Sequence, residues 1–392
     1  MLNILTYTSL YPNAAQPHHG IFVENRLRHL ARCGEAQITV VAPVPFFPLR
    51  AKFFGRYADY ARAPRREIRH GLNVHHPRYP VIPKIGMSIA PRLMAAGTRS
   101  LMARLAADGT RFDLLDAHYF YPDGVAAAVL AERLELPLVV TARGSDISEI
   151  ATYDSPRRQI LWAARRARVV VTVCDALRAA LIELGVDRDR IEVIRNGVDL
   201  ELFEYRNPSE VRGRLDWFGP LLLSVGHLIP RKGHDLVIRA LSEIEGARLA
   251  IIGEGPEGPR LKSLAARLGL AERVYFVGRV PHQELANFYS AADLLVLASS
   301  REGWANVLLE ALACGTPVVA TDVWGTKEAV CEPIAGELVG ERSPQAIARA
   351  IKRALRKPAD RETVRAYAEG FSWRETTDRQ LALFSAIADR RR

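Results

Sequence analysis

Residues 294–321 read LLVLASSREGWANVLLEALACGTPVVAT and hold a complete strand–helix–strand unit. The first six and the last six of these residues are apolar runs with the length and composition of buried strands. Between them, a helix is expected to begin at Ala305 or Asn306 and to end before Gly315. Two strands joined by one helix are typical of a parallel sheet, because parallel strands need a long crossover connection.

Apolar strands alternate with helices over both halves of the chain. In the first half, strands are expected at residues 3–8, 38–43, 73–81, 114–119, 137–142, 169–174 and 191–196. In the second half, strands are expected at residues 221–226, 247–253, 274–278, 294–299 and 316–321. We therefore predict an α/β protein with two Rossmann-like doubly wound parallel-sheet domains.

The chain has 392 residues, which is more than one hydrophobic core usually sustains. Asn-Gly and Asn-Pro turns interrupt a polar stretch at residues 196–210. We predict an N-terminal domain of residues 1–198, a C-terminal domain of residues 199–373, and a last helix within residues 374–392. Ligands bind at the carboxyl ends of parallel strands, so we expect a central cleft between the domains to hold the functional site.

Two carboxylates, Glu302 and Glu310, stand before and after the expected helix start in residues 294–321. The free N–H groups and the positive end of the helix dipole make that start a seat for a phosphate. Each carboxylate can accept hydrogen bonds from a pair of hydroxyl groups. An anionic linker between two diols is the shape of a nucleotide sugar, which we therefore expect as the ligand.

A pair of cations, Arg231 and Lys232, lies on the loop after the strand at residues 221–226. Two fixed cations at a strand end are expected to neutralise a diphosphate, both when it is bound and when it departs. Taken alone, the pair is more simply interpreted as a solvated basic loop. The glutamate pair favours the functional interpretation.

Glycines close two strands of the second half. Gly226 ends the first strand, and Gly253 and Gly255 form a turn after the next one. Such residues let the backbone approach a flat ligand, for example a nucleobase. Arg279 and Val280 follow the third strand and are expected to border the same base. Because Gly-x-Gly turns are common, an ordinary turn is the alternative.

Polar residues also follow strands of the first half. His118 lies at the end of one strand, and Arg143, Gly144 and Asp146 follow the next strand. A His and an Asp at strand ends that face a cleft are candidate partners for sugar hydroxyls or for a transferred proton. Gly20 precedes the first helix, where a substrate could approach the helix N-terminus. A structural His and a plain turn are the alternatives.

No metal site and no cofactor besides the ligand itself are predicted. Asp187 and Asp189 form an Asp-x-Asp pattern, but turns between a helix and a strand are often acidic. The Gly-Glu-Gly-Pro turn is not followed by the Gly-Lys-Ser/Thr of a Walker loop. The cysteines form no Cys-x-x-Cys pair and are expected to be free and mostly buried in a reducing cytoplasm. They are Cys33, Cys174, Cys314 and Cys331.

The formal charge of +10 is concentrated in residues 46–112, which hold thirteen Lys and Arg against three Asp and Glu, interleaved with Phe, Tyr and Ile. Such a surface suits anionic lipid headgroups. A solvated basic face or a soluble anionic partner is the alternative, and nucleic acid is not expected because no nucleic-acid-binding motif accompanies the segment. No signal peptide and no apolar run of about 20 residues are visible, so we expect a cytoplasmic protein that is peripheral on the inner face of the plasma membrane.

Four sequence elements together resemble the retaining family 4 glycosyltransferases, and the resemblance covers nearly the whole chain. EGWANVLLE at residues 302–310 matches the E-x7-E element of that family, and RKG at 231–233 matches its diphosphate loop. NGVD at 196–199 resembles its interdomain segment, and FSW at 371–373 resembles the start of its closing helix. The resemblance implies the two-domain GT-B fold, in which the last helix crosses back to an acceptor-binding N-terminal domain.

The resemblance also implies an activity: metal-independent, retaining transfer of a sugar from a nucleotide-diphosphate donor to a saccharide or lipid-linked acceptor. It places this transfer in the synthesis of a cell envelope or exopolysaccharide. A sugar-nucleotide 2-epimerase of the same fold and a non-catalytic nucleotide-sugar-binding subunit are the alternatives.

The resemblance further implies roles for individual residues. Glu302 would hold donor sugar hydroxyls, Glu310 the ribose, and Arg231 with Lys232 the diphosphate. The start of the helix would contact the phosphate or the sugar through Asn306, Val307 and Leu308. The sequence departs from the family in two places. Arg143 stands where many members have a His that contacts the donor sugar, and Gly303, Trp304 and Ala305 stand where Gly-Phe-Gly is common.

Overall fold

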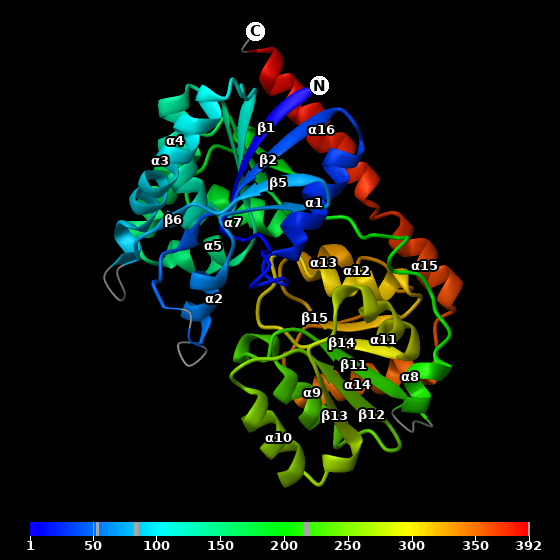
Figure 1. The fold of residues 1–392 in the computed structure, drawn as a ribbon. Coiled ribbons are helices and arrows are strands. Elements are labelled where there is room, and N and C mark those ends of the chain that lie inside the picture. The colour runs from blue at the N-terminus through cyan, green and yellow to red at the C-terminus, as the bar shows by residue number, and fades with distance from the viewer. Residues whose placement is uncertain (50, 52–54, 82–85, 215–218, 391–392) are drawn as a thin grey trace. The chain divides into compact units, whose positions relative to one another are not determined.

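The computed structural model describes residues 1–49, 51, 55–81, 86–214 and 219–390. The chain divides into two compact units (Figure 1). Unit 1 consists of Met1–Asn196 and Arg374–Arg392, and unit 2 consists of Gly197–Trp373. The division between Asn196 and Gly197 lies next to the domain boundary expected after residue 198.

Unit 1 is built on an eight-stranded sheet in the order β10-β9-β8-β7-β1-β2-β5-β4. Its strands are β1 (Leu2–Tyr7), β2 (Ala36–Val41), β4 (Arg66–Arg69), β5 (Leu72–His75), β7 (Leu114–His118), β8 (Leu138–Ala142), β9 (Val169–Thr172) and β10 (Ile191–Val193). Neighbouring strands are parallel except that β4 is antiparallel to β5. The short strands β3 (Val44–Pro45) and β6 (Arg78–Tyr79) pair separately, so the single strand predicted at 73–81 is in fact two.

Helices cover both faces of this sheet (Figure 1). They are α1 (Ile21–Arg32), α2 (Arg56–Arg62), α3 (Ala90–Ala107), α4 (Val125–Leu134), α5 (Ser145–Ser148), α6 (Asp154–Arg166), α7 (Asp175–Glu183) and α16 (Trp373–Asp389). On one face, Leu27 of α1 and Phe384 of α16 share a hydrophobic core with Ile4 and Val139. The last helix of the chain therefore packs against the sheet of unit 1, as the resemblance predicted.

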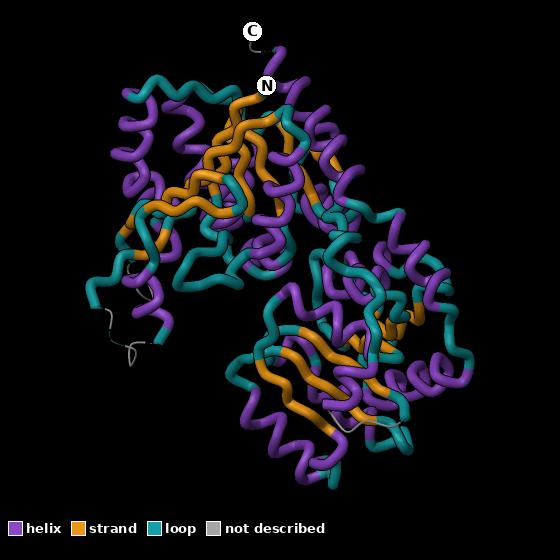
Figure 2. Tube along the Cα trace, turned by 45° about the vertical axis from the view of Figure 1, so that its right-hand side comes forward, coloured by secondary structure: helices purple, strands orange, loops and turns teal. Residues whose placement is uncertain are grey.

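Unit 2 contains a six-stranded, wholly parallel sheet in the order β13-β12-β11-β14-β15-β16 (Figure 2). Its strands are β11 (Leu221–Val225), β12 (Arg248–Ile252), β13 (Val274–Gly278), β14 (Leu294–Leu297), β15 (Val318–Thr321) and β16 (Gly336–Val339). Its helices are α8 (Ser209–Arg214), α9 (His234–Leu241), α10 (Gly258–Arg267), α11 (Leu285–Ala291), α12 (Asn306–Ala313), α13 (Gly325–Ala329), α14 (Pro344–Arg356) and α15 (Arg361–Glu369).

Residues 294–321 form β14, α12 and β15, as predicted. All four side chains of β14 are buried, and Leu308 and Leu309 of α12 are fully buried. The helix ends before Gly315, whose φ of 72° is a left-handed conformation that glycine adopts without strain. The local sequence pattern alone was therefore sufficient to predict this strand–helix–strand segment.

Among the parallel strands, the order reverses at one place in each sheet. In unit 1 the reversal lies between β1 and β7, and in unit 2 it lies between β11 and β14. The loops that leave the carboxyl ends of such neighbouring strands diverge, and ligands of α/β proteins bind in the crevice that results. The loops after β11 and β14 carry the two cations and the first glutamate singled out in the sequence.

Two further expectations concern the whole chain. Cys174 and Cys314 are buried but Cys33 and Cys331 are exposed, so the prediction of mostly buried thiols holds for only half of them. All four are free thiols. Among the helices of the described residues, none is both long enough and apolar enough to cross a membrane.

Candidate active site

The loops after β11 and β14 bring Arg231, Lys232 and Glu302 together. Lys232 Nζ lies 2.6 Å from Glu302 Oε1, and an Nη atom of Arg231 lies 3.6 Å from Glu302 Oε2. The hydroxyl of Ser299 donates a 2.6 Å hydrogen bond to Glu302 Oε1. The reversal point of the unit 2 sheet therefore holds a cluster of two cations and one carboxylate, which we call the cation–carboxylate cluster.

Glu302 is buried, and its ionisation reflects two opposing influences. Burial favours the neutral acid most, but Lys232, Ser299 and Arg231 together outweigh it, so the pKa of Glu302 is lowered from its usual value. The side chain is consequently a carboxylate at neutral pH. It can accept hydrogen bonds from hydroxyl groups, and it is a weak base.

Two glycines allow the loops after β11 and β14 to pack closely. Gly233 has a φ of 68°, and a β-carbon there would overlap the carbonyl oxygen of Ala298 after β14. At Gly226, a β-carbon would lie 3.3 Å from Cε of Lys232, so the bare backbone leaves room for the lysine stem. The sequence analysis included Gly233 in the Arg-Lys-Gly element but predicted no role for it. The cluster thus depends on two positions without side chains.

Glu310 lies on α12 and is held by other partners. His282 Nε2 lies 3.0 Å from Glu310 Oε1, and the hydroxyl of Tyr289 donates a 2.8 Å hydrogen bond to Glu310 Oε2. The ring of Phe203 packs edge-on against His282 and Tyr289, at centroid distances of 5.1 and 5.9 Å. A carboxylate has about four acceptor positions, so Glu310 keeps capacity for a ligand diol.

The start of α12 lies between these two carboxylates in the sequence. No side chain caps this helix in the described part of unit 2, and the amide of Leu308 bonds the carbonyl of Ala305. Leu308 and Trp304 are buried, and Gly303, Asn306 and Val307 are half-buried. The Trp304 ring packs against Phe371, at a centroid distance of 6.3 Å. The Trp304 and Leu308 side chains thus belong to the interior of unit 2, so any ligand contact at these two positions would be through the backbone.

The glycine turn after β12 has a structural reason. A β-carbon at Gly253 would overlap the backbone of Gly226, and one at Gly255 would overlap the backbone of Leu228. Both glycines therefore let the turn pack against the start of the loop that carries Arg231 and Lys232. The approach of a nucleobase to this turn stays a prediction. Arg279 is exposed and forms a 2.8 Å ion pair with Glu254, and Val280 is half-buried.

In unit 1, Asp146 organises the loops after β7 and β8. Its buried carboxylate accepts hydrogen bonds from the amides of Phe120 (2.8 Å), Gly144 (2.7 Å) and Arg143 (3.1 Å). Burial raises the pKa of Asp146. Because these bonds fill most of its acceptor capacity, Asp146 holds the backbone in the position where the sequence predicted a contact with substrate.

His118 points into the interior of unit 1 and not toward solvent, which corrects the expectation of a cleft-facing residue. It is fully buried, with Nδ1 2.7 Å from an Nη of Arg143 and Nε2 3.1 Å from Asp116. Since guanidinium only donates, Nδ1 must accept and the ring proton lies on Nε2. Burial lowers the pKa of His118 to about 4, so the ring is neutral at pH 7.

Arg143 bonds to other interior groups as well. Its second Nη donates a 3.0 Å bond to Asn196, and its guanidinium lies 5.5 Å from the ring centroid of Phe22. Burial lowers the pKa of Arg143 to about 9. Gly20 has a φ of 74°, and a β-carbon there would overlap the backbone of Leu10. These candidates have clear structural roles.

One residue at the reversal point of unit 1 was missed in the sequence. Asp123, after β7, is fully buried, and the amide and hydroxyl of Ser9, after β1, both donate to its carboxylate. Burial raises the pKa of Asp123 to about 7. Its place in Tyr-Pro-Asp-Gly after a strand was the available signal.

Comparison with known proteins decides the family. Residues 20–202 match the model of "Glycosyltransferase Family 4", and residues 215–371 match that of "Glycosyl transferases group 1". A D-inositol 3-phosphate glycosyltransferase of Frankia alni is 34% identical over 341 residues, covering 79% of this chain and 83% of that protein. The chain belongs to this family of glycosyltransferases.

Two further proteins are similar to this glycosyltransferase. A Bacillus subtilis protein, TuaC, provisionally assigned as a glycosyltransferase of teichuronic acid biosynthesis, is 30% identical over 367 residues, covering 90% of this chain and 89% of that protein. The structure of Anabaena Alr3699/HepE in complex with UDP matches with a TM-score of 0.76 and 21% identity, covering 98% of this chain and 100% of that one. The family resemblance and the two-domain GT-B fold are thus confirmed.

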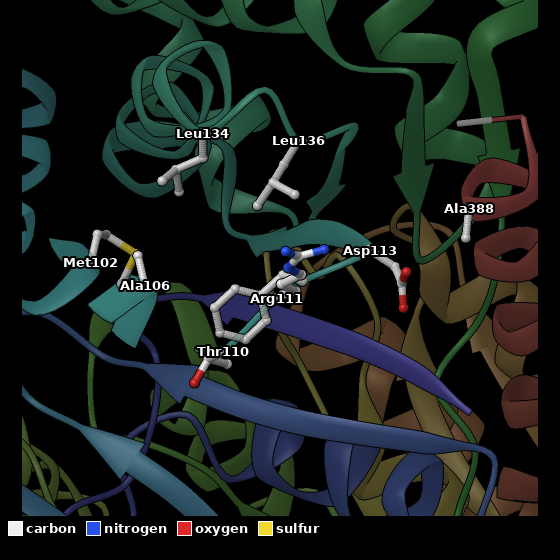
Figure 3. Close-up of a pocket in the computed structure, with 9 residues that line it drawn as sticks. Met102, Ala106, Thr110, Arg111, Asp113, Leu134, Leu136 and Ala388 are labelled. Carbon is white, nitrogen blue, oxygen red and sulfur yellow. The ribbon is translucent and has the colours of Figure 1, made fainter. Parts of the chain in front are cut away.

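Figure 3 shows a hollow of the glycosyltransferase that is lined by residues of unit 1 alone. Its volume is about 540 Å³. It is lined by Met102, Ala106, Thr110, Arg111, Phe112, Asp113, Leu134, Leu136 and Ala388. Asp113 directly precedes β7, and the amide of Asn3 in β1 donates a 2.8 Å bond to its carboxylate. The hollow therefore opens near the amino ends of the strands, opposite the edge at which ligands of such sheets bind.

Proposed function

We propose that this glycosyltransferase moves a sugar from a nucleotide-diphosphate donor to a saccharide or lipid-linked acceptor, with retention of anomeric configuration and without a metal ion. The observation that carries the proposal is the cation–carboxylate cluster at the reversal point of the unit 2 sheet. In such a cluster, the two cations can bind an anion, and the carboxylate can accept a hydrogen bond from a hydroxyl group next to that anion.

Arg231 and Lys232 neutralise the diphosphate in this proposal. The lysine ammonium has three donors, so it can keep its bond to Glu302 and still donate to a phosphate oxygen. Both cations also stabilise the negative charge that grows on the diphosphate as it departs, which is the largest catalytic contribution we expect. Since side-chain cations occupy the position where a divalent ion would otherwise act, the proposed transfer is metal-independent.

The carboxylates and the start of α12 bind the rest of the donor. Glu302 accepts hydrogen bonds from hydroxyls of the transferred sugar, and Glu310 accepts them from the ribose. The amides at the start of α12, at Asn306 and Val307, face the phosphate or the sugar. Each of these roles uses a group that lies on unit 2.

Retention follows from attack on the face that the diphosphate leaves. The bond between the anomeric carbon and the phosphate oxygen breaks, the bond to the acceptor oxygen forms on the same face, and the acceptor proton passes to the departing phosphate oxygen. Glu302 is a poor base because its pKa is lowered, and His118 is buried away from solvent. Neither is suited to take that proton, which supports the leaving group as the base.

The acceptor and the location of the enzyme form the last part of the proposal. The Bacillus relative points to cell-envelope or exported polysaccharide. The Frankia relative is named for a phosphorylated acceptor, and the HepE structure holds UDP. With the basic segment at residues 46–112, we place the enzyme in the cytoplasm, peripheral on the inner face of the plasma membrane.

A donor screen tests the proposal. The melting temperature of the protein is measured with each common nucleotide-diphosphate sugar, and the true donor should raise it by mass action. That donor is then incubated with candidate acceptors in the presence of EDTA, and the anomeric configuration of the product is read by NMR. A retained configuration supports the proposal. Inversion, a strict need for metal, or conversion of the donor alone into an epimer would overturn it.

A further inference from the structure

Exposed apolar side chains gather in one part of unit 1. In the described residues, seven large apolar side chains of residues 46–89 are exposed. Ile68 (71% exposed) lies on the edge strand β4. The other six are Phe46 (56%), Leu49 (50%), Val81 (47%), Met87 (43%), Ile89 (40%) and Tyr57 (39%). We call these six side chains the apolar face. Single exposed apolar residues are normal, but six from one short stretch of chain indicate an interaction surface.

Contacts between the segments that carry these residues show that they are neighbours. β3 and β6 are parallel and paired, and the amide of Phe46 donates a 2.7 Å bond to the carbonyl of Tyr79. The segments that carry Leu49 and Val81 therefore leave this pair in the same direction. Phe47 packs on Tyr57 of α2 at a centroid distance of 5.3 Å. Figures 1 and 2 both place α2 and the chain before α3 at the same end of unit 1.

The charge of the same segment identifies the partner. Residues 46–112 carry ten more basic than acidic side chains, and exposed Arg92 lies in the first turn of α3, close in sequence to Ile89. Exposed apolar side chains on a segment of net positive charge suit the interface of an anionic bilayer, where the apolar side chains insert among the headgroups and the positive charge attracts them. A protein partner would not require an excess of charge of one sign.

The location of the apolar face relates it to the reaction. β3 follows β2 directly, so the face begins at the carboxyl edge of the unit 1 sheet. Ser9 and Asp123 lie on loops at that same edge. A bilayer bound at the apolar face would therefore lie close to the edge at which α/β sheets receive ligands.

We propose that the apolar face, Phe46, Leu49, Tyr57, Val81, Met87 and Ile89, docks on an anionic lipid bilayer and that the acceptor is presented there on a lipid. The second half of this statement rests on the proposed function, and the first half does not. Docking combines an apolar contribution that salt does not weaken with an electrostatic one that salt screens.

Sedimentation of the full chain with vesicles tests the docking. Phosphatidylglycerol–phosphatidylcholine vesicles should bind the protein, and pure phosphatidylcholine vesicles should bind it much less. Replacing Leu49, Val81 and Ile89 by Ser should weaken binding roughly tenfold or more. Arg92→Ala should weaken it roughly fivefold at low salt. Leu268→Ser, at a similarly exposed residue of unit 2, is the matched control and should change nothing.

Two results would overturn the docking: equal binding to neutral and anionic vesicles, or an undiminished affinity of the triple variant. The same variants are also tested for the rise in melting temperature caused by the nucleotide sugar. This rise should persist in every variant, because the donor site lies on unit 2. Its absence in the wild type would contradict the proposed function and leave the vesicle result intact, so the two failures are distinguishable.

Independent contacts in unit 2 assign roles to Tyr289 and His282. We infer that both are positioning residues that orient Glu310 toward the ribose diol of the donor, which again rests on the proposed function. Tyr289 is fully buried and cannot touch a ligand, so its hydroxyl acts through Glu310. His282 bonds the other carboxylate oxygen. With both oxygens held, the carboxylate is fixed before the donor arrives, and pre-organisation of this kind favours binding.

Calorimetric titration with each common nucleoside 5′-diphosphate and its 2′,3′-dideoxy form tests this role. Tyr289→Phe and His282→Ala should each weaken binding of the ribonucleotide roughly tenfold and leave binding of the dideoxy form unchanged. Tyr367→Phe removes a hydroxyl that bonds the carbonyl of Ala329 and serves as the control. Equal losses for both ligands, or no loss, would overturn the role. If wild type does not distinguish the two ligands, the ribose role of Glu310 itself fails.

Discussion

The carboxyl edges of the two sheets carry similar residues but differ in what those residues contact. In unit 2, Arg231, Lys232 and Glu302 contact one another at the reversal point while both cations remain partly exposed. In unit 1, His118 and Asp146 follow strands in the same manner but are fully buried among their own neighbours. A polar residue that follows a parallel strand is therefore available to a ligand only where the surrounding loops leave its side chain exposed.

The cause of the difference is a buried network that includes the last helix. Arg26 of α1 donates a 2.8 Å bond to Gln380 of α16 and a 3.3 Å bond to Asn196. Asn196 also accepts from Arg143, which bonds His118. Residues of α1 and α16 thus take part in the buried network that holds Arg143 and His118 in the interior of unit 1. In the cation–carboxylate cluster of unit 2, by contrast, the side chains of Arg231 and Lys232 stay 33% and 14% exposed.

Loss of the cluster should have the largest effect on activity. Glu302→Gln and Arg231→Ala should each reduce the transfer rate by about two to three orders of magnitude, because each removes a preorganised group at the site where charge develops. Initial rates at saturating donor measure this effect. Glu337→Gln, which breaks an exposed pair with Arg353, is the control. Full activity in both cluster variants would refute the assignment of the site to unit 2.

Asp146→Ala should instead affect stability. The substitution leaves three buried amides without their acceptor, which should cost about 2–4 kcal/mol of unfolding free energy. Urea denaturation measures this change, and the exposed Asp189→Ala is the control. The folded fraction should retain the transfer rate within roughly tenfold. A variant with normal stability and no activity would show that Asp146 acts on the substrate and that the two edges are alike.

Acid should destabilise unit 1 through His118. Its pKa is about 4 in the folded protein against an ordinary value of 6.5, so the unfolded chain binds the proton more readily as the pH falls. Stability is therefore complete above pH 6.5 and is lost toward pH 4, by about 2 kcal/mol between pH 7 and pH 5. Urea midpoints at the two pH values should differ less in His118→Gln. An unchanged difference would mean that this ring does not titrate as its burial requires.

Arg279→Ala should have the smallest effect. Its ion pair with Glu254 is exposed, so the unfolding free energy should change by less than about 0.5 kcal/mol. If the guanidinium borders the nucleobase, the donor KM should rise a few-fold while kcat stays constant. Steady-state kinetics with varied donor measure both. A large fall in kcat would instead show that Arg279 takes part in catalysis together with the cation–carboxylate cluster.

Residues 294–321 show which parts of the fold can be predicted from sequence. Their apolar periodicity and Gly315 report local structure, and the structure agrees with them. The same reasoning missed β4, whose Arg-Glu-Ile-Arg sequence is polar and half-exposed at a sheet edge, and β16, which begins with a glycine. Strands at an edge bury less apolar surface, so their pattern is weaker.

The candidate site was predictable where cations and a carboxylate share one pair of loops. The inward orientation of His118 was not, because it depends on α16, and Arg26 and Gln380 are 354 residues apart in the chain. Ser299, His282 and Tyr289 were missed because nothing in their local sequence shows which carboxylate they bond. Gly253 and Gly255 were predicted to let a ligand approach, which stays a prediction, and the structure adds that both lie close to the chain's own backbone.

A crystal structure of the protein with a bound nucleoside diphosphate will show whether the donor occupies the cation–carboxylate cluster of unit 2. We predict that diphosphate oxygens lie within hydrogen-bonding distance of both Arg231 and Lys232, with the ribose hydroxyls on Glu310. A diphosphate held by residues of unit 1, or bound to unit 2 away from Glu302, would refute the assignment of the donor site to this cluster.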